Sequence, residues 1–323
     1  MAPEKGAIFY GEFRLYIGKF KMKKNLITTA MLLSLSAFAF AGEQTKTELD
    51  PVMVYSAYAT PVNQDQTASS VTVLTEKEFA ERNATYVSDV LKTVPGVAMG
   101  TSGGRGAVTS LFLRGANSKH TAVIIDGIRV NPADTNFDFG GLALSNIEQI
   151  EVLRGEQSAL WGSDAMGGVV YITTQSGLYK DKLFNVDFDL GTGSHRTRDG
   201  SVTLSGQHHG LYYALHSDSH RTRGISARSE RVFNYTSLSG AKSTNVPATE
   251  KDGFHRDNVS MRLGFDDGQK GVDFLASHSS QTVHFDNSAA HERKFDDNTR
   301  TRETRYKLSG YFGNAEDLFV HKA

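Results

Sequence analysis

Apolar and polar side chains alternate along a series of short segments in roughly the last 140 residues, and this pattern most restricts the folds open to the chain. The segments are NVDFDLG (185–191), GLYYALHS (210–217), VSMRLGF (259–265), VDFLASHS (272–279) and YKLSGYF (306–312). Because successive side chains of a β-strand point to opposite faces, each segment predicts a strand with one apolar face. Segments of about ten residues with this pattern are typical of a transmembrane β-barrel, although a soluble β-sandwich has the same period.

The N-terminal part of the chain predicts export. A basic start at Met22 leads into an apolar run over residues 26–40, which ends in small residues. This is the layout of a secretory signal peptide over 22–41 with cleavage after Ala41, and residues 1–21 are interpreted as a mis-assigned extension. A membrane anchor is the alternative, but the run is shorter than the roughly 20 residues that span a bilayer. No later segment is apolar enough for a transmembrane helix, so an exported chain that embeds in a membrane must form a barrel.

Composition excludes several function classes. Lys and Arg total 35 against 36 for Asp and Glu, which gives no overall attraction to nucleic acid. There is no cysteine, and hence no disulfide framework, thiolate metal site or cysteine nucleophile. Glycine at 31 residues against 6 prolines, with 19 Phe and 12 Tyr, favours an aromatic, turn-rich β protein.

Three composition shifts divide the mature chain. Residues 42–69 form a polar, flexible lead-in, 70–176 a compact α/β domain, and 183–323 the alternating strands. In the middle part the spacing predicts one helix from Glu76 to Val94, stopped by Pro95 and Gly96. Short strands are predicted at 70–74, 110–115, 121–127, 149–155 and 169–175.

The connections between the last strands are of unequal length. Arg221–Arg256 and Thr282–Arg302 are predicted to be long polar extracellular loops, whereas the connections near 191–200 and 266–271 are short. Barrels of the outer-membrane type have long extracellular loops and short periplasmic turns. The two short connections are therefore predicted to be periplasmic.

Several linked phrases resemble the plug domain of TonB-dependent outer-membrane receptors. They are LDPVMVYSA (49–57), YVSDVLKTVPGV (86–97), LFLRGANSKHTAVIIDGIRVN (111–131) and IEQIEVLRGEQSALWGSDAMGGVVYITT (147–174). The resemblance is strong over about 50–176 and rests on pattern alone from 177 to 323. It implies an α+β plug domain inside a transmembrane antiparallel β-barrel in the outer membrane of a Gram-negative bacterium.

The first phrase looks like the TonB box through which such receptors meet an inner-membrane energy transducer. An extended apolar segment on a flexible tether can add as a strand to the edge of a partner sheet. Tyr55 and Ser56 depart from the small Thr and Ala that are usual in this box, and an uninvolved linker is the alternative. The predicted box is Asp50, Pro51, Val52, Met53, Val54, Tyr55 and Ser56.

The resemblance also implies a lock between plug and barrel. Arg114, Glu151 and Arg154 are predicted to form ion pairs with the inner barrel wall, with an ordinary surface ion pair as the alternative. Six glycines fall where strands turn sharply, where positive φ or close backbone approach is required. These structural glycines are Gly115, Gly127, Gly155, Gly162, Gly167 and Gly168.

Enzyme and metal sites find little support. Ser102 lies in a GxSxG match, but a strand rather than a helix is predicted to follow it. His195, His208, His209, His216 and His220 are interpreted as solvated lumen or loop residues, because neighbours such as His208 and His209 point to opposite faces of a strand. Asp286, Asp296 and Asp297 share one predicted loop and are a candidate calcium site.

The strands do not suffice for the whole barrel. The segment after residue 182 holds six or seven strands, whereas plugged transporters have about 22. We therefore expect a truncated or split sequence that does not transport alone. The expected function is uptake of a bulky nutrient that carries cobalt or iron, with no cofactor required. The sequence of the plug phrases resembles cobalamin receptors most, then ferric siderophore receptors, then haem receptors. A secreted plug-like binding or signalling module is the rival from another class.

Overall fold

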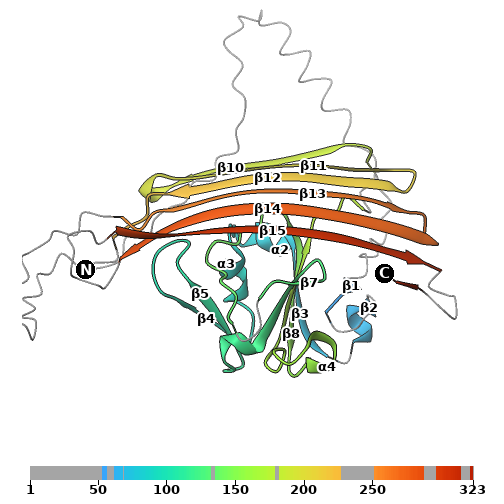
Figure 1. The fold of residues 1–323 in the computed structure, drawn as a ribbon, viewed down its shortest axis with the longest axis horizontal. Coiled ribbons are helices and arrows are strands. Elements are labelled where there is room, and N and C mark those ends of the chain that lie inside the picture. The colour runs from blue at the N-terminus through green and yellow to red at the C-terminus, as the bar shows by residue number, and fades with distance from the viewer. Residues whose placement is uncertain are drawn as a thin grey trace, which may run out of the picture. The chain divides into compact units, whose positions relative to one another are not determined.

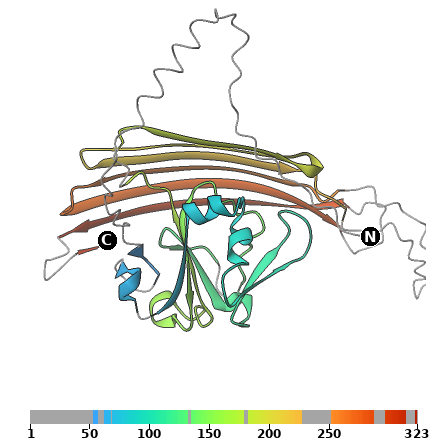
Figure 2. The same ribbon diagram turned by 180° about the vertical axis from the view of Figure 1, so that it is seen from behind.

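The structure, a computed structural model, describes residues 53–56, 62–67, 69–131, 135–178, 182–226, 251–286, 296–313 and 321–322. The predicted signal peptide (22–41) and the predicted extension before it lie outside these residues. Among the described residues, no helix combines the length and the apolar character that crossing a membrane requires. The residues from Met53 onward belong to one compact unit, in which a small α+β domain lies against one face of a long antiparallel sheet (Figures 1 and 2).

The small domain, here called the plug, is built on a five-stranded sheet with the order β3-β8-β9-β6-β7. The strands β6 and β9 run parallel, and the other neighbours run antiparallel. A separate hairpin joins β4 (Val97–Thr101) to β5 (Thr109–Leu113). The five predicted strands correspond to β3, β5, β6, β8 and β9, and each is confirmed to within two residues at each end. The strands of the five-stranded sheet are β3 (Ser70–Thr75), β6 (Thr121–Ile125), β7 (Ile128–Arg129), β8 (Ile147–Arg154) and β9 (Gly168–Thr174).

Both faces of the plug sheet are buried, because its strands are apolar on both sides. On one face the helices α2 (Glu76–Glu81) and α3 (Val87–Leu91) contribute Phe79 and Leu91 to a core that includes Ile150 and Ile172. On the other face a smaller core joins Ala122, Ile124, Leu153, Val169 and Tyr171 to Val54 of β1 (Met53–Val54). The segment ahead of the plug thus completes the plug's second core.

The segment 76–94 forms two short helices, so the prediction of one continuous helix is wrong. The first helix ends in a Schellman motif: Asn83 has a φ of 52°, and the Ala84 N–H donates to the Phe79 carbonyl at 3.1 Å. Asparagine tolerates this left-handed conformation better than most residues. Tyr86 is then extended and pairs with Ala143 before α3 begins. Apolar spacing could not reveal the break, because both helices turn their apolar residues toward the same core.

The long sheet, here called the barrel sheet, is a seven-stranded antiparallel meander in chain order. Neighbours pair continuously, as in Leu215 opposite Met261, Phe265 opposite Val272 and Phe274 opposite Leu308. The number of strands agrees with the six or seven predicted. They are β10 (Asn185–Gly193), β11 (Thr197–His208), β12 (Leu211–Thr222), β13 (Phe254–Asp266), β14 (Lys270–Asp286), β15 (Asp296–Phe312) and β16 (His321–Lys322).

The two faces of the barrel sheet differ in chemistry. Many outward positions hold large apolar residues, and Phe188, Leu190 and Leu308 expose 72%, 69% and 71% of their surface. Inward residues are mostly polar and many are buried by the plug, for example His216 and Asn258. This alternation matches a sheet with lipid on one side and a polar interior on the other.

Two predictions about the barrel connections are wrong. The strands β14 and β15 extend to Asp286 and from Asp296, so the predicted loop Thr282–Arg302 is mostly strand. The strand β11 was not predicted, because Val202 and Leu204 are the only apolar side chains at its outward positions, with Gly200 and Gly206 on either side of them. Counting β11 moves the short connection at 194–196 to the same end of the sheet as the connection at 223–253. This short connection therefore does not share the end of the turn at 267–269.

Candidate functional site

The predicted TonB box lies only partly within the described residues, which include Met53–Ser56 but not Asp50, Pro51 and Val52. In this part, here called the box segment, β1 pairs with β2 (Val62–Asn63), with Met53 opposite Asn63. Val54 and Ser56 are fully buried. The lead-in was predicted to be a flexible tether, and the box segment departs from this because it is docked on the plug.

Three plug side chains hold the main chain of the box segment, and we call them the clamp. Glu151 accepts hydrogen bonds from the Tyr55 N–H at 2.9 and 3.0 Å and from the Ser56 N–H at 2.8 Å. Gln149 lies two residues away on β8 and donates from Nε2 to the Met53 carbonyl at 2.8 Å. Trp161, at the end of α4 (Ser158–Trp161), donates from Nε1 to the Ser56 carbonyl at 2.8 Å.

Aromatic rings lie beside these polar contacts. The ring of Tyr55 stacks on Tyr171 of β9, with centroids 6.1 Å apart and an interplanar angle of 12°. The indole of Trp161 contacts the same Tyr171 ring, with centroids 5.7 Å apart. Such pairs add roughly 0.5–1.5 kcal/mol to the stability that burial provides. The box segment is therefore held by its backbone and by the side chains of Val54 and Tyr55.

The electrostatics of the clamp centre on a buried carboxylate without a cation among its hydrogen-bond donors. Glu151 is fully buried, and its donors are the neutral groups of Tyr55, Ser56 and Gln149. Burial raises the pKa of Glu151, and the N–H groups that donate to the carboxylate lower it only in part. The docked state therefore favours the protonated form of Glu151 more than a hydrated state would.

The other two predicted lock residues also make their described contacts inside the plug. Arg154 donates from Nη1 to Thr72 Oγ1 at 2.7 Å and from Nε to Ser70 Oγ at 3.1 Å, and Arg114 reaches Ser70 Oγ at 3.4 Å. Burial and the nearby charge of Arg114 lower the pKa of Arg154. The described partners of Arg114, Glu151 and Arg154 are thus plug groups, and their lock onto the barrel wall stays a prediction.

Charges do join plug and barrel sheet at another place, the turn at Asp126. Arg262 on β13 lies 3.7 Å from Asp126, from Nη1 to Oδ1, and its Nε donates to Asp273 on β14 at 2.7 Å. Lys307 on β15 donates from Nζ to the Asp126 carbonyl at 2.6 Å. Asp126 Oδ1 also accepts the Thr174 N–H at 2.9 Å. We call Asp126, Arg262, Asp273 and Lys307 the charged seam.

Sequence reasoning missed the charged seam, although two signals pointed to it. Asp126 lies in a tight turn before Gly127, and the two have φ values of 50° and 81°. Arg262 and Lys307 occupy the polar face of alternating strands, where a charged side chain points toward the plug. The pairing itself joins residues 181 positions apart, which no local pattern reports.

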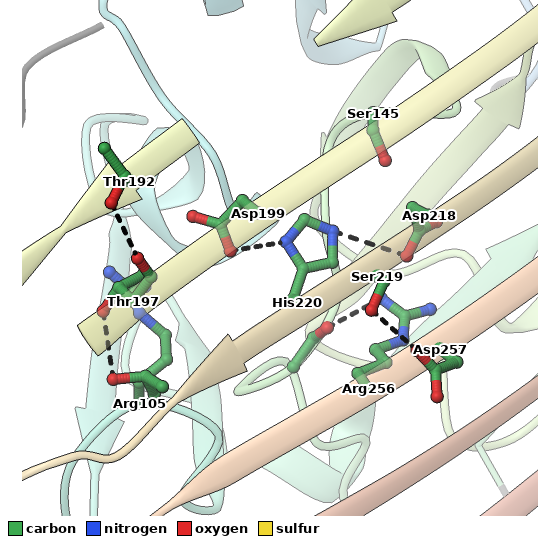
Figure 3. A network of polar contacts seen from close by, with 12 residues as sticks. Arg105, Ser145, Thr192, Thr197, Asp199, Asp218, Ser219, His220, Arg256 and Asp257 are labelled. Carbon is green, nitrogen blue, oxygen red and sulfur yellow. Dashed lines mark hydrogen bonds and ion pairs between the residues drawn. The ribbon is translucent and has the colours of Figure 1, made fainter. Parts of the chain in front are cut away.

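A second contact region lies where β12 and β13 pass residues 141–146 of the plug. Arg256 donates from Nη1 to the Gly141 carbonyl at 2.7 Å, and Asn146 donates from Nδ2 to Ser260 Oγ at 2.9 Å. Figure 3 shows Arg256 beside the polar row described next. The plug is therefore hydrogen-bonded to the barrel sheet in two regions, at the turn of Asp126 and at residues 141–146.

The inner face of β11 and β12 carries a buried row of histidines and carboxylates (Figure 3). His220 lies 2.9 Å from Asp199 and 3.4 Å from Asp218, and His216 lies 2.9 Å from Asp218. The prediction that His216 and His220 are solvated is wrong, because the plug covers them to 3% exposure each. Within the described part of the chain, no group of three or more His, Cys, Asp or Glu side chains is arranged to hold a metal ion.

The remaining predicted site residues take varied places. Five of the six glycines have positive φ: Gly115, Gly127, Gly155, Gly162 and Gly168. At Gly167 an added Cβ would lie 2.9 Å from the Ala116 Cβ, which is a close approach of two chain segments. At Gly168 an added Cβ would overlap the Leu153 carbonyl oxygen, so β8 and β9 can pair only with glycine there.

The enzyme and metal candidates behave as follows. Ser102 lies between β4 and β5, so a strand follows it, as predicted, and the nucleophile-elbow context is missing. His208 and His209 do not point to opposite faces: their rings are 3.9 Å apart, because His209 has a φ of 47° at the turn after β11. Asp286 pairs with Asp296 across the ends of β14 and β15. The side chains of Asp286, Asp296 and Asp297 lie outside the described ones, so calcium binding stays a prediction.

Comparison with known proteins identifies the class. Residues 63–169 match the family model of the TonB-dependent receptor plug domain. The chain therefore carries the plug of a TonB-dependent receptor, followed by part of an antiparallel sheet like the barrels of that family. The family inferred from the sequence phrases is confirmed.

One curated relative is similar to more than half of this chain. The vitamin B12 transporter BtuB of Vibrio vulnificus (strain YJ016) is 39% identical over 187 residues, which cover 58% of this chain and 30% of that protein. The chain thus spans less than a third of the length of this curated relative.

Solved receptors share the fold. The ferripyoverdine receptor FpvA of Pseudomonas aeruginosa matches with a TM-score of 0.60 at 14% identity over 82% of this chain and 34% of its own. The ferric yersiniabactin uptake receptor FyuA of Yersinia pestis matches with a TM-score of 0.55 at 20% identity over 76% and 39%.

Proposed function

We propose that this chain is the plug-bearing part of an outer-membrane receptor that imports a bulky metal-containing nutrient, with energy delivered by a TonB-type inner-membrane transducer. The observation that carries the proposal is the box segment docked on a plug, which itself lies against the polar face of the barrel sheet. In this function the box leaves the plug and adds as a strand to the edge of the transducer's sheet. Pulling on that strand then moves the plug.

Cobalamin is the first choice of nutrient. It is supported by the likeness to the vitamin B12 transporter of Vibrio vulnificus and by the phrase SALWGSDAMGGVVYITT (158–174). Ferric siderophores are the alternative, because solved receptors of similar fold include the ferric yersiniabactin receptor FyuA and the pyoverdine receptor FpvA, and haem ranks third. The cobalt or iron would belong to the cargo rather than to the protein.

Two measurements on the full chain test this proposal. The first is capture by an immobilised periplasmic domain of a TonB-type transducer. The matched variant is Val54→Pro, which removes a main-chain N–H from the box strand. We expect capture of the unaltered chain and a loss of at least about tenfold for the variant, since an added strand relies on its main-chain bonds. Equal capture of both would overturn the coupling role.

The second measurement addresses the nutrient. Cells that lack their own receptors and produce the chain are offered labelled cyanocobalamin, a ferric siderophore or haem. Label retained by outer-membrane fractions identifies the ligand class, and cobalamin is expected to be retained most. Retention of the siderophore alone would replace cobalamin with the alternative.

A further inference from the structure

We propose that Gln149, Glu151 and Trp161 form a peptide site on the plug that reads main-chain atoms, and that its ligand is the chain's own box segment. The site itself stands on the contacts of the docked segment. Its consequence, competition with the transducer for the same backbone, rests on the proposed function. The chemical class of ligand is a peptide that bends directly after a short strand, so that two successive N–H groups reach one carboxylate between two carbonyl acceptors.

The clamp occupies the strand edge that a partner sheet would need. One edge of β1 pairs with β2. Main-chain groups two residues apart point to the same side of a strand, so the Met53 carbonyl and the Tyr55 N–H share the other edge. These are the atoms that Gln149 and Glu151 bind, at 2.8 and 2.9 Å. Both edges of the docked strand are therefore filled, and strand addition to a partner requires the clamp to open.

The polar groups of the site contact backbone, and two side chains of the box segment add packing contacts. The carboxylate, amide and indole groups of the clamp all contact N–H or C=O groups, which every non-proline residue offers. The packing contacts come from Val54, which is fully buried in the plug's second core, and from Tyr55, whose ring stacks on Tyr171 beside Trp161. A tyrosine at this position therefore strengthens docking in this chain, and a small residue there would leave the aromatic rings partly uncovered.

The absence of cysteine from the sequence makes the clamp directly testable. Val54→Cys places a single thiol at a fully buried position of the box segment, with little change in volume. The full chain, folded in detergent micelles at pH 7, is labelled with a polar maleimide, and the rate is compared between backgrounds. Glu151→Leu removes both acceptor oxygens, Trp161→Phe removes only the Nε1–H donor, and Glu156→Leu changes an exposed carboxylate nearby as the matched control.

We expect the thiol to react slowly in the unaltered background. It should react at least about tenfold faster with Glu151→Leu, because two buried N–H groups lose their acceptor. Trp161→Phe should give a smaller increase, and Glu156→Leu none. Fast labelling in the unaltered background, or equal rates in all backgrounds, overturns the proposal.

A second reporter separates local release from unfolding. Val90→Cys, fully buried in α3 and remote from the box segment, should stay slow in every background. Equal acceleration at both positions would mean that the variant unfolds the plug, which also overturns a local clamp. Neither readout needs a nutrient or a transducer, so failure of the uptake proposal would leave this result unaffected.

Discussion

Two carboxylates, Glu151 in the clamp and Asp126 in the charged seam, are both buried, yet they hold their partners by different means. Glu151 binds the box segment through neutral N–H donors. The Asp126 carboxylate lies 3.7 Å from the guanidinium of Arg262, and the Asp126 main-chain carbonyl accepts a hydrogen bond from the Lys307 ammonium group. Breaking a buried ion pair costs more than breaking a contact between a carboxylate and neutral donors, because it leaves charges without partners on both sides.

This difference assigns an order to mechanical release. The box segment can leave the plug without separating an ion pair, and the carboxylate it uncovers gains water. The plug body, in contrast, is tied at one turn to charged side chains on two strands of the barrel sheet, Arg262 on β13 and Lys307 on β15. A pull on the box should therefore open the clamp first and load the charged seam second.

The largest expected effect comes from removing the central cation of the charged seam. Arg262→Met leaves Asp126 and Asp273 without their shared partner, since Arg262 lies 3.7 and 2.7 Å from them. The free energy of unfolding of the plug should fall by about 3 kcal/mol, the cost typical of an uncompensated buried charge. Urea titration followed by the emission of Trp161, the one tryptophan in the sequence, measures this.

Arg300→Met is the control for that change, because Arg300 is exposed on β15. Its effect should stay within about 0.5 kcal/mol. If both variants lowered stability equally, the charged seam would contribute no more than any surface arginine, and the contrast with the clamp would fail.

The next effect concerns the aromatic part of the clamp. Tyr55→Thr restores the small residue usual in this box and removes the ring that stacks on Tyr171. Docking should weaken by about 1 kcal/mol, or roughly fivefold in population. Maleimide labelling of Val54→Cys reports the change, and Tyr55→Phe, which retains the ring, should label at the original rate. Faster labelling with Tyr55→Phe as well would assign the contribution to the hydroxyl group instead.

The same two carboxylates show what the sequence can predict. The strand β8 and the turn after β6 were predicted from the plug phrases, because strands and glycine turns depend on consecutive residues. The partners of Glu151 and Asp126 were not predicted, since Ser56 lies 95 positions from Glu151 and Lys307 lies 181 positions from Asp126. Family resemblance assigned Glu151 to the barrel wall, whereas its described contacts are with the box segment. Folding chooses among polar partners by tertiary proximity, which a local pattern does not contain.

In the barrel sheet, the local pattern itself failed to reveal one strand. Alternation identified strands rich in large apolar residues, such as β12 with Leu211 and Leu215, but missed β11, where only Val202 and Leu204 mark the outward face. One missed strand reversed the side assigned to the connection at 194–196.

Clamp strength should depend on pH in a direction set by Glu151. Burial raises its pKa above the ordinary 4.5, whereas release into water returns it toward that value. The docked state therefore binds protons more tightly, so docking is strongest below the released-state pKa and weakens as pH rises through the docked pKa. Trp161 emission should shift to the red over that rise, and Glu151→Gln should abolish the shift. Release on acidification instead would contradict the assignment.

The smallest effect should come from the close approach of plug and barrel sheet at Gly141. An added Cβ there would lie 2.6 Å from Gln281 Oε1 and 3.0 Å from the Phe254 ring. Both neighbours are the ends of side chains and can shift, so Gly141→Ala should lower the free energy of unfolding by less than about 1 kcal/mol. Gly104→Ala is the control, because its Cβ would have no neighbour within 4 Å. A loss above about 2 kcal/mol at Gly141 would mean that packing, as well as charge, fixes the plug against the sheet.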